Sequence, residues 1–290
     1  MFVTTVNREV KHMKRVGLFI VALVLVLAML PFGNPLPIVA QPESTEVGGI
    51  ISENTTWMAA NSPYIATSSV LVSEGVTLTI EPGVTVKFDS NLALQIDGEL
   101  VAQGTEENPI TFSSNEASSA PGDWGYILFS DKSTDATYDG DDNYISGSIM
   151  EHCIVEYAGS STPQGAVRII SSSPFISYCT IKSNANGGIY AQNTNYLHII
   201  HNTVSSNNKD GICVRYSQQP YIICNIVTNN SDTGIYVHDS DNAEINYNLI
   251  RGNKGYGKGG GIDILWGRRF NISKNIIVNN SAQRGGGIYF

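Results

Sequence analysis

Two series of residues that could do chemistry recur along the C-terminal half of the sequence. They follow a repeated Gly-Ile step, whose isoleucine we expect to point inward from a β-strand. The alternation of side chains along a strand then turns the residues one and three places later outward on one face. The first outward series is Tyr190, Cys213, Tyr236, Asp263 and Tyr289, and the second is Gln192, Arg215, His238 and Leu265.

Three members of these series could act in catalysis, because they come from consecutive copies of the repeat. Arg215 or His238 would abstract a proton or protonate a leaving oxygen, and Asp263 would be the carboxylate partner. Aromatic rings could stack on sugars, and guanidinium groups can hold uronate carboxylates in bidentate pairs. The candidate ligand-binding residues are Tyr190, Tyr236 and Tyr289, with Trp266, Arg268 and Arg269 in the loop after Leu265.

The same residue types are also normal on any exposed sheet face, where cross-strand pairs stabilise the ladder. Glycoside hydrolysis requires two carboxyl groups about 5 to 9 Å apart. Most carboxylates of the C-terminal half stand in turns beside Gly, Asn or Ser, where they are expected to cap the backbone. These are Asp210, Asp232, Asp239 and Asp241. The histidines are scattered, so no metal centre and no required cofactor is predicted, and binding without catalysis is favoured.

A polar, acidic segment interrupts the repeats at residues 130–148. A long excursion from a rigid stack is a place where binding residues gather. Asp139, Asp141 and Asp142 could supply hard oxygen ligands for calcium, although the Glu that closes an EF-hand loop is missing. Clusters of Asp and Gly are also ordinary turn chemistry, which favours a solvated, hairpin-like excursion over a calcium site.

The elements that must position these residues are short strands in a fixed repeat. Asn marks the register in two columns, one at residues 202, 225, 248 and 275 and the other at 184, 207, 230, 253 and 280, mostly 23 residues apart. Each copy has two runs rich in Ile, Val and Tyr, split by Asn, Gly and Ser, with no helical period. Self-similarity at this period predicts an all-β, single-stranded parallel β-helix of about 23 residues per coil, with Asn side chains stacked from coil to coil.

The N-terminal part of the chain predicts a signal peptide over residues 1–40, with Met13 as an alternative start. Basic residues precede an apolar run, Val16 to Leu30, which is short for a membrane span, and a cleavage site follows at Ala40. The β-helix then occupies 41–290, and no membrane span is expected after cleavage. We therefore expect a secreted or cell-surface protein, although an uncleaved anchor is the alternative.

The distribution of charge indicates which classes of partner are expected, and the positions of the cysteines indicate whether they form disulfides. Residues 41–160 hold 19 acidic and two basic side chains, whereas 161–290 hold six acidic and eleven basic ones, so nucleic acid is not an expected partner. The four cysteines are expected to fall at different places around the coil, with no two stacked on one another. They are therefore predicted to be free packing residues.

The segment "NTTWMAANSPYIATSSVLVSEGVTLTIEPGVTVKF", the later "PGDWGYILFS" and the Asn/Gly repeats together resemble secreted right-handed parallel β-helix proteins. These belong with the pectate-lyase-like superfamily and the NosD-like proteins with PbH1-type repeats. The resemblance implies a right-handed helix over nearly the whole chain after the signal peptide. It is less specific about activity, because such proteins include polysaccharide lyases, glycoside hydrolases, adhesins and surface proteins without known chemistry.

Two functions follow from these observations. The first is a secreted or surface β-helix that binds polysaccharide or another cell-surface ligand without turning it over. The second is a polysaccharide lyase or glycoside hydrolase acting on acidic polysaccharide. Phe290 falls inside a predicted strand with no polar cap after it, so we expect further coils or another domain beyond it.

Overall fold

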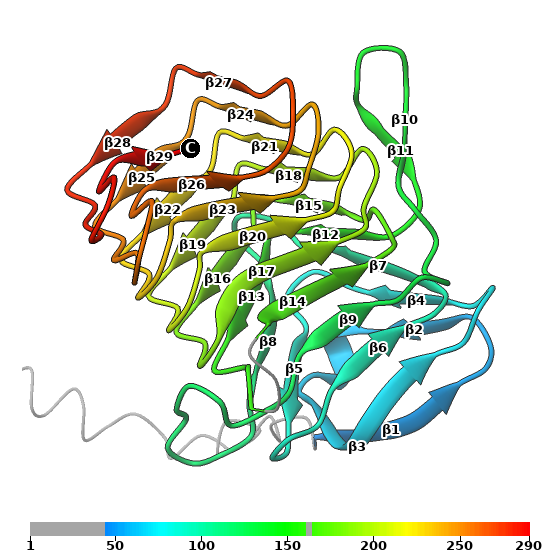
Figure 1. Ribbon diagram of the computed structural model, residues 1–290. Helices are drawn as coiled ribbons and strands as arrows, with labels where there is room; N and C mark the ends of the chain where they lie inside the picture. The colour runs from blue at the N-terminus through cyan, green and yellow to red at the C-terminus, as the bar shows by residue number, and fades with distance from the viewer. Residues whose placement is uncertain (1–43, 161–163) are drawn as a thin grey trace, which may run out of the picture. The chain divides into compact units, whose positions relative to one another are not determined.

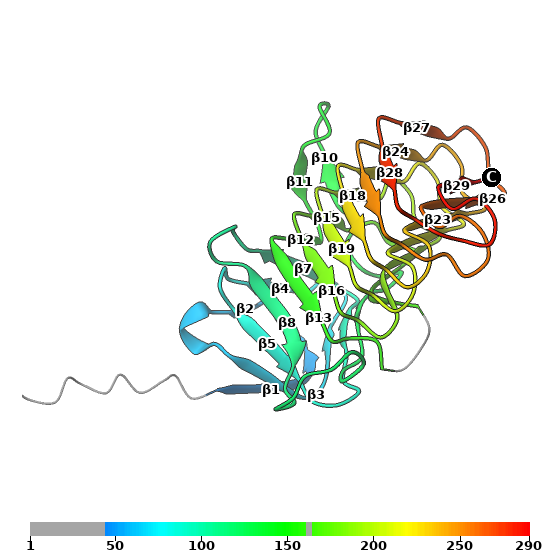
Figure 2. The same ribbon diagram turned by 90° about the vertical axis from the view of Figure 1, so that its left-hand side faces the viewer.

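The structure, a computed structural model, describes residues 44–160 and 164–290. The predicted signal peptide at 1–40 lies outside the described residues. The short strands of the chain wind around one axis, so that each strand pairs in parallel with the equivalent strand one coil earlier and one coil later (Figures 1 and 2). Each coil contributes one strand to each of three faces, which are numbered here in chain order.

The strands of the three faces are as follows. Face 1 contains β2 (Thr55–Trp57), β4 (Thr77–Ile80), β7 (Glu99–Gln103), β12 (Ile149–Glu151), β15 (Phe175–Ser177), β18 (His198–Ile200), β21 (Tyr221–Ile223), β24 (Glu244–Asn246) and β27 (Asn271–Ser273). Face 2 contains β5 (Thr85–Phe88), β8 (Ile110–Ser114), β13 (Cys153–Glu156), β16 (Thr180–Lys182), β19 (Thr203–Ser205), β22 (Ile226–Thr228), β25 (Leu249–Arg251) and β28 (Ile276–Val278). Face 3 contains β6 (Leu94–Ile96), β9 (Ile127–Phe129), β14 (Gly165–Ile170), β17 (Gly187–Gln192), β20 (Ile212–Arg215), β23 (Ile235–His238), β26 (Ile262–Leu265) and β29 (Ile288–Tyr289).

The first coil is built differently from the rest. β1 (Thr45–Ile51) pairs with the long β3 (Tyr64–Val72), and a short 3-10 helix, η1 (Ala59–Asn61), lies between β2 and β3. β3 then pairs with β5 through its first half and with β6 through its second half. Faces 2 and 3 therefore begin from one strand and separate in the coils that follow.

The interior of the coils is a single apolar core formed by every second residue of each strand. In β4 and β5 the inward residues are buried and the residues between them are half-exposed, as the alternation of side chains along a strand requires. Phe88 and Trp124 stack with their ring centroids 4.3 Å apart and are fully buried. Burial of this kind is the main favourable term for a solenoid, because each coil covers the apolar face of its neighbour.

The two Asn columns form the predicted ladders at the corners of the coil. Nδ2 of Asn202 donates to Oδ1 of Asn225 over 3.1 Å, and Asn225 repeats this contact with Asn248. The second ladder has the same geometry, for example between Asn207 and Asn230 at 3.0 Å. Except for Asn275 and Asn280 at the end of each ladder, these side chains are buried, so each amide satisfies backbone groups that the turn would otherwise leave without partners.

One cysteine prediction is wrong. All four cysteines are free, but Cys153 and Cys179 stand on neighbouring coils, one place before the paired residues Ile154 and Thr180. The coil between them is 26 residues long rather than 23, so a constant period misaligned the two positions.

The acidic segment at 130–148 forms a hairpin of β10 (Thr137–Tyr138) and β11 (Tyr144–Ser146), which projects beside β12, β15 and β18 (Figures 1 and 2). Tyr138 packs its ring against His198, with centroids 4.1 Å apart, and Tyr144 stacks on Phe175. The hairpin is therefore docked onto the outer surface of face 1 by aromatic contacts.

Candidate ligand-binding site

The two outward series stand in register on face 3. Tyr190 pairs with Cys213, which pairs with Tyr236, and the column continues through Asp263 to Tyr289. The second series aligns Gln192, Arg215, His238 and Leu265 in the same way. The strand register that positions the candidate residues therefore follows from the Gly-Ile steps alone.

The exposure of these residues differs from the expectation. Cys213 and Asp263 are only 5% and 6% exposed, and the tyrosines of the column are half-buried. Asp263 is covered by the turn that precedes β26, because Gly259 lies directly against the Asp263 side chain. Between β25 and β26 this turn carries extra residues, and Ile235 and Ile262 are paired although they are 27 residues apart.

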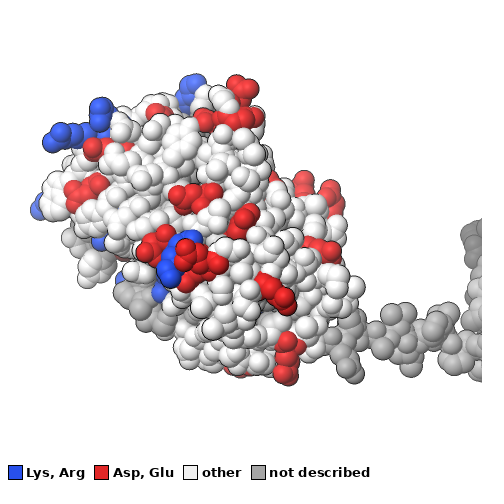
Figure 3. Space-filling model, turned by 90° about the vertical axis from the view of Figure 1, so that its right-hand side faces the viewer, with Lys and Arg blue, Asp and Glu red and all other residues white. Residues whose placement is uncertain are grey.

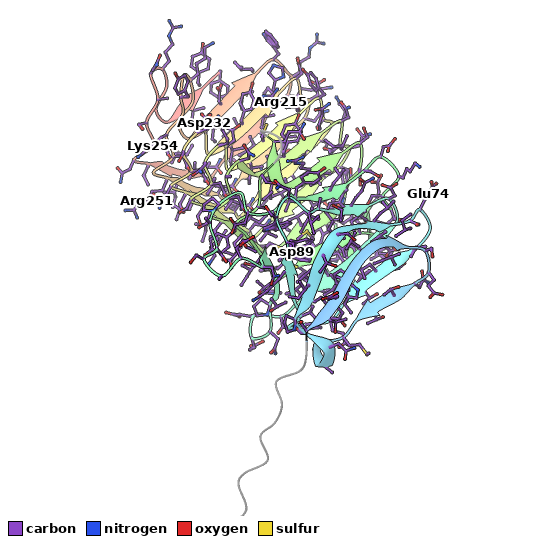
Figure 4. The ribbon with its side chains drawn as sticks, turned by 90° about the horizontal axis from the view of Figure 1, so that it is seen from below. Glu74, Asp89, Arg215, Asp232, Arg251 and Lys254 are labelled. Atoms are coloured by element: carbon purple, nitrogen blue, oxygen red, sulfur yellow. The ribbon has the colours of Figure 1, made fainter. Side chains whose placement is uncertain are left out.

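Strand and turn residues border an open pocket of about 260 Å³ on the outer side of face 3. It is lined by Asp210, Arg215, Asp232, Thr233, Tyr236, Tyr256, Gly257, Lys258, Asp263 and Leu265. Figure 4 labels Arg215 and Asp232, which come from β20 and from the turn before β23. The pocket thus combines three carboxyl groups, two cations and two phenol rings.

Two polar atoms of this pocket are buried without a partner. Among the described residues, none hydrogen-bonds to Oδ1 of Asp263 or to Nε of Arg215. Burial also raises the pKa of Asp263 above its ordinary value, an effect that Lys258 opposes and Asp232 reinforces. An unpaired buried polar atom costs about 1 to 3 kcal/mol.

Asp210 and Asp232 form a pair of carboxyl groups at the edge of the pocket. The backbone N–H of Thr233 donates to Oδ1 of both, over 3.2 Å and 3.0 Å, and the N–H of Tyr256 also donates to Asp232. Burial, followed by repulsion from Asp232, raises the pKa of Asp210 to about 7. Near neutral pH Asp210 is therefore both a possible proton donor and a possible acceptor.

Aromatic rings lie beside the cations of the site. The guanidinium carbon of Arg215 lies 5.1 Å from the centroid of the Tyr236 ring, and Nζ of Lys258 lies 4.6 Å from that of Tyr289. Burial raises the pKa of Tyr236 to about 12, so it is a neutral phenol. Tyr256 is 85% exposed at the rim. Cations within about 6 Å of a ring centroid are attracted to the ring face.

The structure brings together only some of the predicted site residues. Arg215, Tyr236 and Asp263 line the pocket, and Tyr289 contacts Lys258 at its side. His238 does not line it, because the ring contacts Trp266, with centroids 5.1 Å apart, and Nδ1 lies 3.4 Å from Asp239.

The remaining predicted contacts are placed outside the pocket. The hydroxyl of Tyr190 donates to Gln192 over 2.6 Å, three coils away from Asp263. Trp266, Arg268 and Arg269 are exposed in the turn after β26, where the N–H of Arg268 donates to Asp241. They form a separate rim beside His238 rather than part of the pocket.

The tip of the hairpin does not gather its carboxylates. Oδ1 of Asp139 accepts the backbone N–H groups of Asp141 and Asn143, each over 2.9 Å, and hydrogen bonds from Asn143 lower its pKa. Asp142 instead accepts the hydroxyl of Tyr196 over 2.6 Å. Within residues 44–160 and 164–290, no group of three or more His, Cys, Asp and Glu side chains could hold a metal ion. Calcium binding at this tip stays a prediction.

Four charged or phenolic residues of the pocket were not among the predicted site residues. Asp210 and Asp232 were interpreted as turn caps, which they are, but each directs its carboxyl group to the pocket as well. Their position before each Gly-Ile step was the available signal. Tyr256 and Lys258 belong to the insertion in "KGYGKGGG", where the departure from the 23-residue period marked a longer turn.

The face of the stack that Figure 3 shows is mostly uncharged. On the side shown in Figure 3, Asp and Glu side chains are scattered over the whole height of the described residues, and no continuous basic stripe runs along it. The part of the chain that the structure describes contains no helix of the length and apolar character needed to cross a membrane.

Comparison with known proteins agrees with this architecture. A family model described as "Right handed beta helix region" matches residues 139–290, and one described as "Pectate-lyase like beta helix domain" matches residues 49–167. Among curated proteins, "Protein bark beetle" of Drosophila melanogaster is 36% identical over 85 residues. That match covers 29% of this chain and 3% of the fly protein, so the chain spans a small part of its length. No solved structure matches the chain. The chain belongs to the right-handed parallel β-helix family, within the pectate-lyase-like group of folds.

Proposed function

We propose that this protein is a secreted or cell-surface β-helix that binds a polysaccharide through the pocket on face 3. The observation that carries the proposal is the lining of this pocket, which brings Asp263, Arg215 and Lys258 together with two phenol rings. A sugar ring carries several hydroxyl groups, each of which both donates and accepts. One hydroxyl could donate to a carboxylate of the pocket while another accepts from a cation.

The rest of the pocket supports a saccharide over an apolar ligand. Charged and phenolic groups dominate its lining, and Leu265 is the one aliphatic side chain among the described residues that line it. The exposed ring of Tyr256 could cover the apolar face of a sugar. Arg215 and Lys258 would favour a sugar that carries a carboxylate, provided that Asp210 is protonated.

Binding to a panel of soluble polysaccharides, both neutral and uronate-containing, tests this proposal by calorimetric titration. We expect Asp263→Asn and Arg215→Ala to weaken binding at least tenfold, because each removes a buried hydrogen-bonding partner of the ligand. Arg251→Ala is the matched control, since Arg251 is an exposed arginine on β25 of face 2 (Figure 4). Equal loss in Arg251→Ala and Arg215→Ala would contradict a site on face 3.

Hydrolysis of a glycosidic bond is the second candidate function, favoured by the carboxyl pair Asp210 and Asp232. A carboxyl group whose pKa is about 7 can protonate a leaving oxygen at neutral pH, and a neighbouring carboxylate can assist attack on the sugar. This differs from the catalytic role first considered for His238, which lies outside the pocket.

Release of reducing ends, or of unsaturated products, from the same polysaccharides separates binding from turnover. If the chain hydrolyses a substrate, Asp210→Asn should abolish product formation while leaving binding within a few fold. Asp239→Asn is the control, because Asp239 is a partly exposed turn residue beside His238. Binding without product formation in the wild-type protein would exclude hydrolysis of these polysaccharides and support the binding function.

A further inference from the structure

Cys153 and Cys179 occupy the same corner of successive coils. β13 and β16 pair with Ile154 opposite Thr180, which puts the two cysteines directly above one another one residue earlier. Strands of a sheet lie about 4.8 Å apart. That separation falls within the Cα distances of about 4.4 to 6.8 Å that a disulfide spans. Both side chains are 1% exposed.

The two thiols stand where later coils place an Asn. The N–H of Cys179 donates to Oδ1 of Asn202, so Cys179 continues the ladder of Asn202, Asn225 and Asn248. Its Sγ contacts the carbonyl oxygens of Met150 and Ser177 at 3.4 Å and 3.2 Å. Asn202 uses Nδ2 for the equivalent carbonyl groups, those of Ile176 and Ile200.

The Cys153 thiol occupies the equivalent place one coil earlier. Its Sγ contacts the carbonyl oxygens of Ala102 and Glu151, and Ala102 is paired with Met150, whose carbonyl Cys179 contacts. The two thiols therefore follow one another in the same interior column, and burial raises the pKa of the Cys153 thiol well above its ordinary value. Asn side chains at these two positions would have linked the coils by hydrogen bonds, whereas two cysteines can link them covalently.

We propose that Cys153 and Cys179 form a disulfide that joins two successive coils when the chain folds in the presence of a disulfide oxidant. One thiolate attacks a small-molecule disulfide such as glutathione disulfide, and one glutathione thiol leaves. The second cysteine attacks the mixed disulfide and releases the second glutathione, so the chain loses two hydrogens and the oxidant gains them. Because both thiols are buried, this exchange takes place before β13 and β16 close.

The other two cysteines provide an internal comparison. Cys213 lies on the outer side of β20, between Tyr190 and Tyr236, and Cys224 lies in the turn after β21. Each has a tyrosine or a histidine, rather than a cysteine, in the adjacent positions of its column: Cys213 between Tyr190 and Tyr236, Cys224 between His201 and Tyr247. Neither has a partner for a link between coils.

The experiment refolds the full chain from reductant and denaturant in a buffer of glutathione disulfide and glutathione, followed by alkylation and peptide mapping. We expect a linked pair of peptides containing Cys153 and Cys179, loss of two hydrogens from the intact mass, and alkylation of Cys213 and Cys224. The oxidised protein should melt roughly 5 °C or more above the reduced protein, because a loop of this length is closed. The double variant Cys213→Ser/Cys224→Ser should keep both the link and the shift.

Two results would overturn the proposal. One is alkylation of both Cys153 and Cys179 after refolding, and the other is a link from either of them to Cys213 or Cys224. Protein secreted into an oxidising bacterial compartment and mapped without reduction gives the same readout if refolding is inefficient. The mapping uses the wild-type chain, so the outcome does not depend on whether Cys153→Ser folds.

Discussion

The contribution of a single Asn to the ladder can be worked out for Asn225, which stands in the middle of its column and is fully buried. Nδ2 of Asn225 donates to the carbonyl oxygen of Ile199 and to Oδ1 of Asn248, over 2.8 Å and 3.1 Å. Its Oδ1 accepts the backbone N–H and Nδ2 of Asn202, over 2.9 Å and 3.1 Å. Asn225→Ala removes all four hydrogen bonds at once.

Each such bond contributes about 1 kcal/mol net, and buried groups left unpaired cost more, so we expect a loss of about 4 kcal/mol in the free energy of unfolding. For a chain of this size the loss corresponds to roughly 10 °C in melting temperature. The assay is urea and thermal unfolding of purified protein, followed by circular dichroism. The matched control is Asn271→Ala, where an exposed Asn makes one side-chain contact, to Glu244.

The control variant should lose less than about 1 kcal/mol, since exposed contacts contribute little. If Asn225→Ala and Asn271→Ala unfolded at the same urea concentration, stacked amides would not be what holds the corners together. Asn275→Ala should fall between the two, because Asn275 is only part-buried and bonds to a single neighbouring Asn.

Three further predictions concern the pocket, the hairpin and the close approach of coils. Burial raises the pKa of Asp210 to about 7, above the value of about 4 in the unfolded chain. Its protonated form therefore contributes stability that is fully present below about pH 4 and is lost as pH rises through 7. Asp210→Asn should flatten this pH dependence in thermal unfolding measured from pH 4 to 8. The hydroxyl of Tyr138 is buried without a partner among the described residues, so Tyr138→Phe should leave the melting temperature unchanged or raise it. Tyr138→Ala should instead lower the free energy of unfolding by about 3 kcal/mol and expose residues 130–148 to proteases. A methyl group added at Gly211 would lie 2.5 Å from Cγ1 of Val227 and 2.6 Å from the carbonyl oxygen of Gly234, so Gly211→Ala should destabilise the fold by about 1 to 3 kcal/mol or more, whereas Gly140→Ala, in the open hairpin turn, should not.

The repeat allowed the fold and the register to be predicted from sequence. In a solenoid, each residue's neighbours are set by the spacing between copies, so the Asn columns and the Gly-Ile steps placed Tyr236 opposite Asp263 without any knowledge of distant contacts. The inward and outward alternation of β4 and β5 followed from the same logic.

The parts that could not be predicted lie where the period changes. A 26-residue coil brought Cys179 over Cys153, and a 27-residue coil supplied Tyr256 and Lys258 to the pocket. The sequence pattern predicts whether a side chain points inward or outward from a strand. Whether an outward side chain is then buried depends on the conformation of the neighbouring turn, which the pattern does not predict. For this reason His238 was grouped with Arg215 and Asp263, although it turns instead toward Trp266.

The lengthened corner between β25 and β26 also has a practical consequence. Ile250 still pairs with Val227 and Ile277, and Ile262 with Ile235 and Ile288, so the strands on both sides keep their partners around the extra residues. The residues that set the strand register and the turn residues Tyr256, Gly257 and Lys258 are thus different positions of the chain. Residues 256–258 are accordingly a graft site, where a loop of new length and composition could be introduced, provided that the buried Gly255, Gly259 and Gly260 beside them are kept.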